Sequence, residues 1–324
     1  MREIYLTLHN KPRTRKRKSY LNEQTVIVEH APKWREYYKL CKPKVVILII
    51  FTAVVGMLLA VPGALPLGKI IFATLGIGLA AASGAAINQL VEQRIDAIMA
   101  RTRNRPLPQG KLNTVNAFVF ALTLCAISMA ILIYKINVLT ALLTFISLIG
   151  YAVIYTMFLK PATPQNIVLG GAAGAAPPLL GWVAMTGEVS SEALLLFLII
   201  FIWTPPHFWA LAIRRREEYA SVGIPMLPVT HGVAFTKLQI LLYTILLLAV
   251  SVLPFVIQMS GVIYLAGAIA LGLGFIRQAL ILYRSDTDDH AMKTFGFSIF
   301  YLSMLFGFLL LDHYARIFIR YFFL

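Results

Sequence analysis

Nine apolar stretches, nearly free of charged residues, follow one another along this chain. A helix needs about 20 apolar residues to cross a bilayer, and among open-ended segments only a helix satisfies its own backbone groups in lipid. The 13% of charged residues is about half the share usual in soluble domains. The sequence therefore predicts an all-α polytopic membrane protein with nine transmembrane helices. We expect these near residues 44–62, 69–90, 115–134, 138–158, 166–187, 192–213, 237–257, 261–282 and 293–313.

The positive charges predict which side of the membrane each connection occupies. If the spans alternate in direction, the N-terminal tail and connections 91–114, 159–165, 214–236 and 283–292 share one face with the adjoining helix ends. That face carries 25 of the 29 Lys and Arg residues, leaving Lys69, Lys135, Arg316 and Arg320 on the other. Because Lys and Arg are enriched in cytoplasmic connections, we expect a cytoplasmic N-terminus and a C-terminus outside.

The net charge of +15 is concentrated in part before the first span, in the run Arg13–Lys18. Such a run can bind nucleic acid, but it more often sets topology or contacts anionic lipids. The run contains no interleaved aromatic residues, so we expect no nucleic-acid partner. Residues 1–40 are predicted to form a basic, partly disordered cytoplasmic tail, and residues 41–324 the nine-helix transmembrane domain.

Three oxygen-bearing side chains stand at four-residue spacing at the cytoplasmic end of the second stretch: Asn88, Glu92 and Asp96. On a continuous helix this spacing puts all three on one face. Acids are costly near lipid, so their presence indicates a function. An amide and two carboxylates are suitable ligands for a hard divalent cation such as Mg²⁺.

The second half of the chain repeats this pattern loosely. The sixth stretch ends at Arg214–Arg216, and the acids Glu217 and Glu218 follow directly. Carboxylates that hold a metal, beside arginines that bind phosphate oxygens, are the groups required by a magnesium diphosphate. The alternative is two solvated charge clusters that only set topology. Acids contribute little to topology, which favours the functional interpretation.

A run of small residues, 170–181, invites comparison with a phosphate-binding loop. It lacks the preceding strand and the Lys-Ser or Lys-Thr pair of that loop. Small residues four apart in an apolar span more often allow close helix packing, which we expect here. Pro177 and Pro178 predict a break in the fifth helix.

Several motifs give the chain a family resemblance. The Asn88, Glu92 and Asp96 spacing resembles the first metal motif of the intramembrane aromatic prenyltransferase superfamily. Further segments are similar to its branch that farnesylates heme B, and the similarity extends from about Lys42 to the end of the last span. These segments are Lys42-Pro43, 101–107, 155–160, 163–168, 205–210 and 223–229.

The resemblance implies a transmembrane prenyltransferase of the cell inner membrane that transfers a farnesyl group from farnesyl diphosphate to a vinyl group of heme B. Water then adds, giving heme O. The implied cofactor is Mg²⁺, and the implied partners are heme A synthase or terminal oxidase assembly. By the same likeness Asn88, Glu92 and Asp96 hold one magnesium, and the second-half acids hold another. The expected substrate contacts are Arg101, Arg105, Lys111, Lys160, Arg214, Arg215, Trp209 and Tyr219.

Two positions depart from the family pattern. Glu92 stands where the superfamily usually has Asp, and Glu218 stands where it has an Asp before the Tyr. Both substitutions keep the charge, so we expect retained function with altered geometry. Glu218 is the favoured second-half ligand over Glu217 because it directly precedes Tyr219.

His207, between Pro206 and Phe208, is the histidine most suited to chemistry. A neutral imidazole can ligate heme iron or move a proton, whereas the structural alternative is a hydrogen-bonded histidine in a proline-rich helix. The family motif favours function. Two other functions remain open: prenylation of an aromatic quinone precursor, and transport. Acids gathered at one rim, rather than at the midplane, disfavour a transporter.

Overall fold

The structure is a computed structural model that describes residues 33–323. No strand occurs in that range, which belongs to one compact unit. Residues 1–32 of the predicted tail lie outside the described residues, whereas its last part, Lys33–Leu40, forms the helix α1.

Long helices of membrane-spanning length make up most of the described chain. Eight of them are long and apolar enough to cross a bilayer, and α1 with α2, bent by 49° at their junction, provides a ninth. The prediction of an all-α multi-pass membrane protein is therefore confirmed. The spans are α2 (Pro43–Leu59), α3 (Leu67–Val91), α5 (Thr114–Lys135), α6 with its continuation (Val138–Ala162), α8 (Asn166–Thr186), α9 (Ser191–Arg214), α12 (Gly232–Val256), α13 (Val262–Arg284) and α14 (His290–Phe323).

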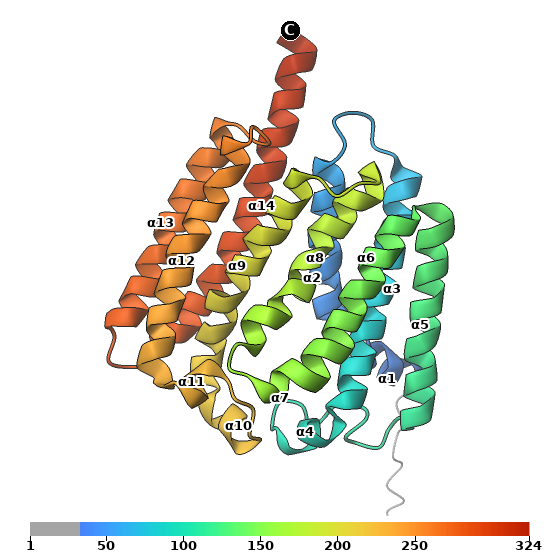
Figure 1. Ribbon diagram of the computed structural model, residues 1–324, viewed down its shortest axis with the longest axis vertical. Coiled ribbons are helices and arrows are strands. Elements are labelled where there is room, and N and C mark those ends of the chain that lie inside the picture. The colour runs from blue at the N-terminus through green and yellow to red at the C-terminus, as the bar shows by residue number, and fades with distance from the viewer. Residues whose placement is uncertain (1–32, 324) are drawn as a thin grey trace, which may run out of the picture. The chain divides into compact units, whose positions relative to one another are not determined.

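The short helices gather at one end of this unit. They are α1, α4 (Gln93–Ile98), α7 (Lys160–Ala162), α10 (Arg216–Ser221) and α11 (Leu227–Thr230). Figure 1 shows all of them at the same end of the long helices, while the α2–α3, α8–α9 and α12–α13 connections lie at the other end. This arrangement agrees with the alternation of sides expected from the sequence.

Helices α2 and α8 approach so closely that their backbones touch. A Cβ added at Gly181 would overlap the carbonyl of Ala53, and one added at Gly56 would overlap the carbonyl of Pro178. Each glycine thus makes room for the other helix's backbone, as small residues do between membrane helices. The close packing predicted for the small-residue run is present at Gly181.

The predicted break at Pro177 and Pro178 is wrong, because α8 continues through both residues. A proline has no N–H to donate, so Pro177 leaves the carbonyl of Ala173 without its usual helical partner. Ser147 Oγ of α6 donates a hydrogen bond to that carbonyl at 3.4 Å. A neighbouring hydroxyl therefore compensates for the missing donor, which is how prolines are tolerated in membrane helices.

The fourth span changes its winding halfway. It begins as α6 (Val138–Ile149), continues as a π-helix, η1 (Gly150–Leu159), and ends in α7. π-Helical segments are rare and often occur at functional sites. The segment contains Tyr151, Tyr155 and Thr156 and leads directly into α7.

Candidate active site

The first oxygen cluster lies where α3 gives way to α4. Glu92 is the C-cap of α3, and α4 begins at Gln93. The three residues therefore do not lie on one continuous helix, contrary to the prediction. The backbone N–H of Glu92 still bonds to Asn88 O at 3.0 Å, and that of Asp96 to Glu92 O at 2.8 Å. These i to i−4 bonds keep the residues stacked across the break.

All three side chains of this cluster are buried, with relative exposures of 3% for Asn88, 7% for Glu92 and 1% for Asp96. Buried carboxylates require compensation by hydrogen bonds or opposite charge. The cluster therefore needs partners from elsewhere in the fold.

Each member of the cluster is paired with one cation from a different segment. Lys42, between α1 and α2, donates to Asn88 Oδ1, and Lys160 of α7 pairs with Glu92 Oε1. Arg105, in the α4–α5 connection, pairs with Asp96 Oδ2 at 2.6 Å. Three separate connections thus meet on the oxygens of one cluster.

Tyr219 brings the second half of the chain to this cluster. It is buried in α10, packed in one apolar cluster with Met99 and Trp209. Burial raises the pKa of its hydroxyl, while the nearby positive charges of Arg101 and Arg215 oppose that rise. The charge of Glu92 also acts on this hydroxyl, so the two halves lie within electrostatic reach of each other.

The two acids of the second half differ in their surroundings. Glu217 is exposed, whereas Glu218 is half-buried and its Oε1 is buried without a hydrogen-bond partner in residues 33–319. A buried carboxylate oxygen without a partner costs free energy unless a ligand satisfies it. This difference favours Glu218 over Glu217 as a ligand.

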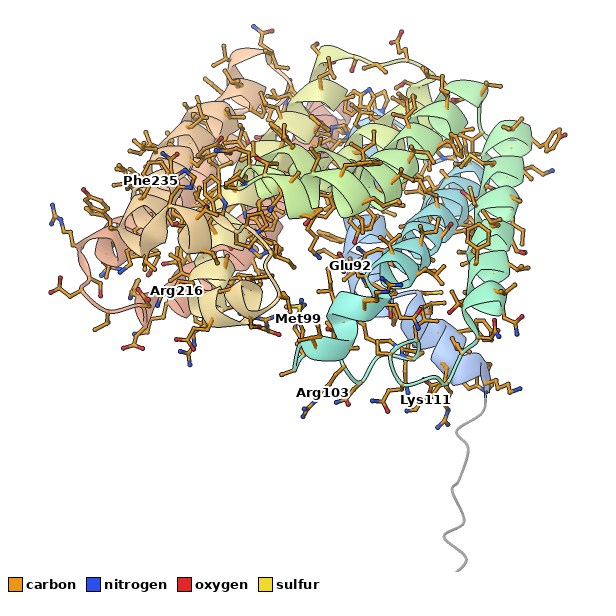
Figure 2. All side chains as sticks on the ribbon, turned by 60° about the horizontal axis from the view of Figure 1, so that its bottom comes forward. Glu92, Met99, Arg103, Lys111, Arg216 and Phe235 are labelled. Atoms are coloured by element: carbon orange, nitrogen blue, oxygen red, sulfur yellow. The ribbon has the colours of Figure 1, made fainter. Side chains whose placement is uncertain are left out.

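Some predicted substrate contacts lie away from the centre. Arg101, Lys111 and Arg214 are exposed, and Figure 2 shows Lys111 and Arg103 at the outer edge while Glu92 and Met99 lie further inside. Trp209 is almost fully buried and packs edge-on against Tyr243. The structure therefore brings Arg105 and Lys160 to the cluster, but not Lys111 or Trp209.

The cluster has a donor set suited to magnesium. Among residues 33–319 no group of three or more His, Cys, Asp or Glu side chains is gathered as in a preformed metal site. The set is instead one amide and two carboxylates, with the unpartnered oxygen of Glu218 in the second half. Mg²⁺ keeps several waters and uses one or two carboxylates with substrate phosphates, so these residues fit the ion.

An apolar cavity of about 390 Å³ starts beside this cluster and extends into the bundle. Lys42, Tyr151 and Tyr155 line one part of it, and the charge of Glu92 acts on both tyrosines. Val45 and Leu48 also line it and are about half exposed on the outside of α2. The cavity therefore connects the charged cluster with the outer surface of the helix bundle, and its size is within the range of ligand sites.

His207 also lines the cavity. Its ring stacks between Trp203, at 4.1 Å between centroids, and Phe295, at 4.6 Å. Its Nδ1 lies 2.7 Å from Ser298 Oγ, and its Nε2 has no hydrogen-bond partner among the described residues. The ring is thus held in place with one nitrogen available.

Three residues of the site were not among the predicted site residues: Lys42, Thr156 and Tyr155. All three lie in segments noted only as family motifs, Lys42-Pro43 and 155–160, although a lysine directly before an apolar span is a recognisable signal. Thr156 and Tyr155 owe their position to the π-helix η1, which the hydrophobic pattern does not indicate. Asn166, the first residue of α8, donates from Nδ2 to Lys160 O at 3.2 Å.

Comparison with known proteins identifies relatives over nearly the whole chain. The sequence matches the UbiA prenyltransferase family over residues 49–305. It is 65% identical over 292 residues to protoheme IX farnesyltransferase of Thioalkalivibrio sulfidiphilus, covering 90% of this chain and 97% of that protein. It is 63% identical over 281 residues to the protein of the same name from Nitrosococcus oceani, covering 87% and 94%.

Solved structures share the fold at low sequence identity. A digeranylgeranylglyceryl phosphate synthase superposes with a TM-score of 0.75 at 20% identity, covering 87% of this chain and 98% of that one. A UbiA homologue from Archaeoglobus fulgidus bound to DMAPP and Mg²⁺ superposes with a TM-score of 0.61 at 16% identity, covering 85% and 99%. These similarities establish the helical architecture.

Proposed function

Because the chain belongs to the UbiA prenyltransferase family, we propose that it transfers the farnesyl group of farnesyl diphosphate to a vinyl group of heme B, giving heme O. The observation that carries this proposal is the 65% identity, over 90% of the chain, to a protein named protoheme IX farnesyltransferase. The reaction consumes one water. It breaks the bond between farnesyl C1 and its diphosphate oxygen, forms a bond from C1 to the vinyl group, and releases diphosphate and a proton.

Departure of the diphosphate is the step for which the charged cluster is suited. Asn88, Glu92 and Asp96 would hold one magnesium ion, and Glu218 would contribute to a second. Magnesium, when bound, neutralises the negative charge that develops on the leaving diphosphate. This assignment is supported by the burial of the three oxygens and by the unpartnered oxygen of Glu218.

The cations of the cluster would change partners when substrate binds. Lys160 and Arg105 now neutralise the carboxylates of Glu92 and Asp96, and Lys42 donates to the amide oxygen of Asn88. If magnesium takes those oxygens, the three cations become free to bind diphosphate oxygens, where charge-assisted hydrogen bonds are strong. Arg101 and Arg215, whose charges act on Tyr219, are further candidates for diphosphate contacts.

The apolar cavity would hold the reacting carbon chain away from water. Farnesyl is an uncharged hydrocarbon, and the cavity wall is made largely of apolar side chains and glycines of α2, α3, α8 and α9. Exclusion of water protects a reactive allylic carbon until the vinyl group attacks. Tyr151 and Tyr155 line the cavity within electrostatic reach of Glu92, which suits the point where C1 leaves its diphosphate.

His207 would act on heme B through Nε2. A free imidazole nitrogen in the cavity can bind heme iron or take up the proton released when water adds. The stacking on Trp203 and Phe295 limits rotation of the ring. This geometry supports a role in binding or orienting the heme edge.

The orientation of the protein in its membrane is inferred from the charge distribution. We propose that the protein lies in the cell inner membrane with the cluster end and the N-terminus in the cytoplasm, because 25 of its 29 Lys and Arg residues belong to that face. Its product would pass to heme A synthase or to terminal oxidase assembly.

Turnover by the purified protein tests this function. With Mg²⁺, farnesyl diphosphate and heme B in detergent micelles, we expect a heme product larger by one hydroxyl and one farnesyl group, detected by mass spectrometry. Prenylation of 4-hydroxybenzoate in its place would indicate the quinone-precursor activity. Magnesium-independent substrate flux in vesicles without turnover would indicate transport.

A further inference from the structure

Thr156 makes an unusual hydrogen bond in the π-helix. Its Oγ1 donates to the carbonyl of Tyr151, five positions earlier, at 2.7 Å. Other buried or half-buried threonines, such as Thr204 and Thr244, donate to the carbonyl four positions earlier, as is usual in α-helices. The wider winding of η1 therefore sets the direction of the Thr156 hydroxyl.

The oxygen of Thr156 also accepts a hydrogen bond from the site. Asn88 Nδ2 donates to Thr156 Oγ1 at 3.2 Å, and both side chains are buried. A hydroxyl has one hydrogen, which Thr156 gives to Tyr151, so toward Asn88 it can only accept. This fixes the amide with its nitrogen toward Thr156.

The opposite end of the same amide faces the cations. Asn88 Oδ1 accepts a hydrogen bond from Lys42, whose ammonium is also within electrostatic reach of Glu92 and Asp96. If the amide turned over, its NH₂ group would face the Lys42 ammonium and could not ligate a cation. The orientation set by Thr156 is therefore the one in which Asn88 can act as an oxygen ligand.

We propose that Thr156 is a positioning residue that holds the Asn88 oxygen toward the magnesium site. The proposal rests on the proposed function, which makes Asn88 a metal ligand. Residues that hydrogen-bond to the ligands of a metal site fix the orientation of those ligands. Their loss typically lowers metal affinity or activity by about 10–100-fold. Thr156 would act through the amide of Asn88 and would not touch substrate.

A pair of substitutions separates the hydroxyl from the shape of the side chain. Thr156→Val keeps the branched shape and removes the hydroxyl, and Thr156→Ser keeps the hydroxyl and removes the methyl group. The readout is Mn²⁺ binding by electron paramagnetic resonance, with inorganic pyrophosphate and no heme. We expect Thr156→Val to raise the half-saturating Mn²⁺ concentration by about 10–100-fold and Thr156→Ser to stay near wild type.

Kinetics give a second readout. In Thr156→Val, the half-saturating Mg²⁺ concentration for turnover should rise, while kcat recovers at high Mg²⁺. Thr244→Val is the matched control, because Thr244 is buried and its hydroxyl bonds only to the carbonyl of Ile240. An unchanged half-saturation in Thr156→Val, or equal losses in Thr156→Val and Thr156→Ser, would overturn the proposal.

Substitution of Asn88 distinguishes this inference from the proposed metal site. In Asn88→Asp both ends of the group are oxygen, so orientation no longer matters and adding Thr156→Val should change Mn²⁺ binding little. If adding Thr156→Val to Asn88→Asp weakens Mn²⁺ binding as much as it does in the wild-type background, Thr156 does not act through Asn88. Such a result would contradict the proposal even if Thr156→Val alone folds poorly. If Asn88→Ala binds Mn²⁺ like wild type, the metal assignment itself fails. If Asn88→Ala loses Mn²⁺ and Thr156→Val does not, only the role of Thr156 fails.

Discussion

Ser298 holds the imidazole of His207, with Ser298 Oγ 2.7 Å from His207 Nδ1. The serine hydroxyl donates its one hydrogen to the carbonyl of Phe295 at 2.6 Å. It must therefore accept from His207, which places the imidazole hydrogen on Nδ1 and leaves a lone pair on Nε2. This fixes which nitrogen of His207 is basic in the cavity.

His207→Gln should remove most of the activity while leaving the protein folded. The amide lacks a basic nitrogen, so we expect turnover to fall by about 10²–10⁴-fold, the range that acid–base groups contribute. An absorbance titration with heme B, without farnesyl diphosphate, checks whether heme binding changes as well. His231→Gln is the control, since His231 is exposed and bonds to its neighbour Thr230. Full activity of His207→Gln would contradict a role in the reaction.

Asp96→Ala should abolish turnover with the protein still inserted in the membrane. It removes a predicted metal ligand and the partner of Arg105, and we expect a loss in kcat of at least about 10²-fold, as for other charge-stabilising groups. Turnover over a range of Mg²⁺ concentrations measures it. Asp289→Ala, at an exposed acid of the α13–α14 connection, should remain active. Retained activity of Asp96→Ala would show that the first cluster is not the metal site.

Glu218→Gln should weaken magnesium binding more than Glu217→Gln does. Of these two acids, Glu218 has a buried oxygen without a partner among the described residues, whereas Glu217 is exposed. Removal of the charge from a ligand should raise the half-saturating Mg²⁺ concentration by about 10-fold or more. Equal effects in the two variants would reject this distinction.

Gly174→Val should reduce the use of farnesyl diphosphate more than that of the shorter geranyl diphosphate. Gly174 lines the cavity, and a Cβ there would meet no atom within 4 Å, so a side chain would enter the space meant for substrate. Small changes of pocket size alter selectivity by about 10–200-fold. Measurement of kcat/KM for both diphosphates tests this. An unchanged ratio would show that the chain does not pass Gly174.

Gly181→Ala should destabilise the fold, whereas Gly174→Ala should not. The new methyl group at residue 181 would overlap the carbonyl of Ala53 in α2, but at residue 174 it meets open space. Overpacking costs about 1–3 kcal/mol, and occasionally more. Thermal unfolding in detergent compares the two variants, and equal stability would refute the proposed backbone contact between α2 and α8.

The sequence alone determined the helical architecture and indicated which residue types could form the site. Nine apolar stretches leave a helical bundle as the stable solution, because backbone groups in lipid must bond within their own segment. The order of the spans predicted which connections share one face, and the spacing of Asn88, Glu92 and Asp96 indicated metal-binding chemistry. These features are local or compositional, so they can be read without knowledge of contacts.

Only the tertiary structure decided how the site is held together. Arg105 lies nine positions from Asp96, but Lys42 and Lys160 lie 46 and 68 positions from Asn88 and Glu92. Pairings at the two longer distances leave no periodic signal in the sequence. At Pro177 of the continuous helix α8, a hydroxyl from α6 bonds to the freed carbonyl, a contact that a local rule for proline cannot include. The π-helical segment that places Thr156 beside Asn88 was likewise not predictable, since the hydrophobic pattern of the fourth span is the same for either winding.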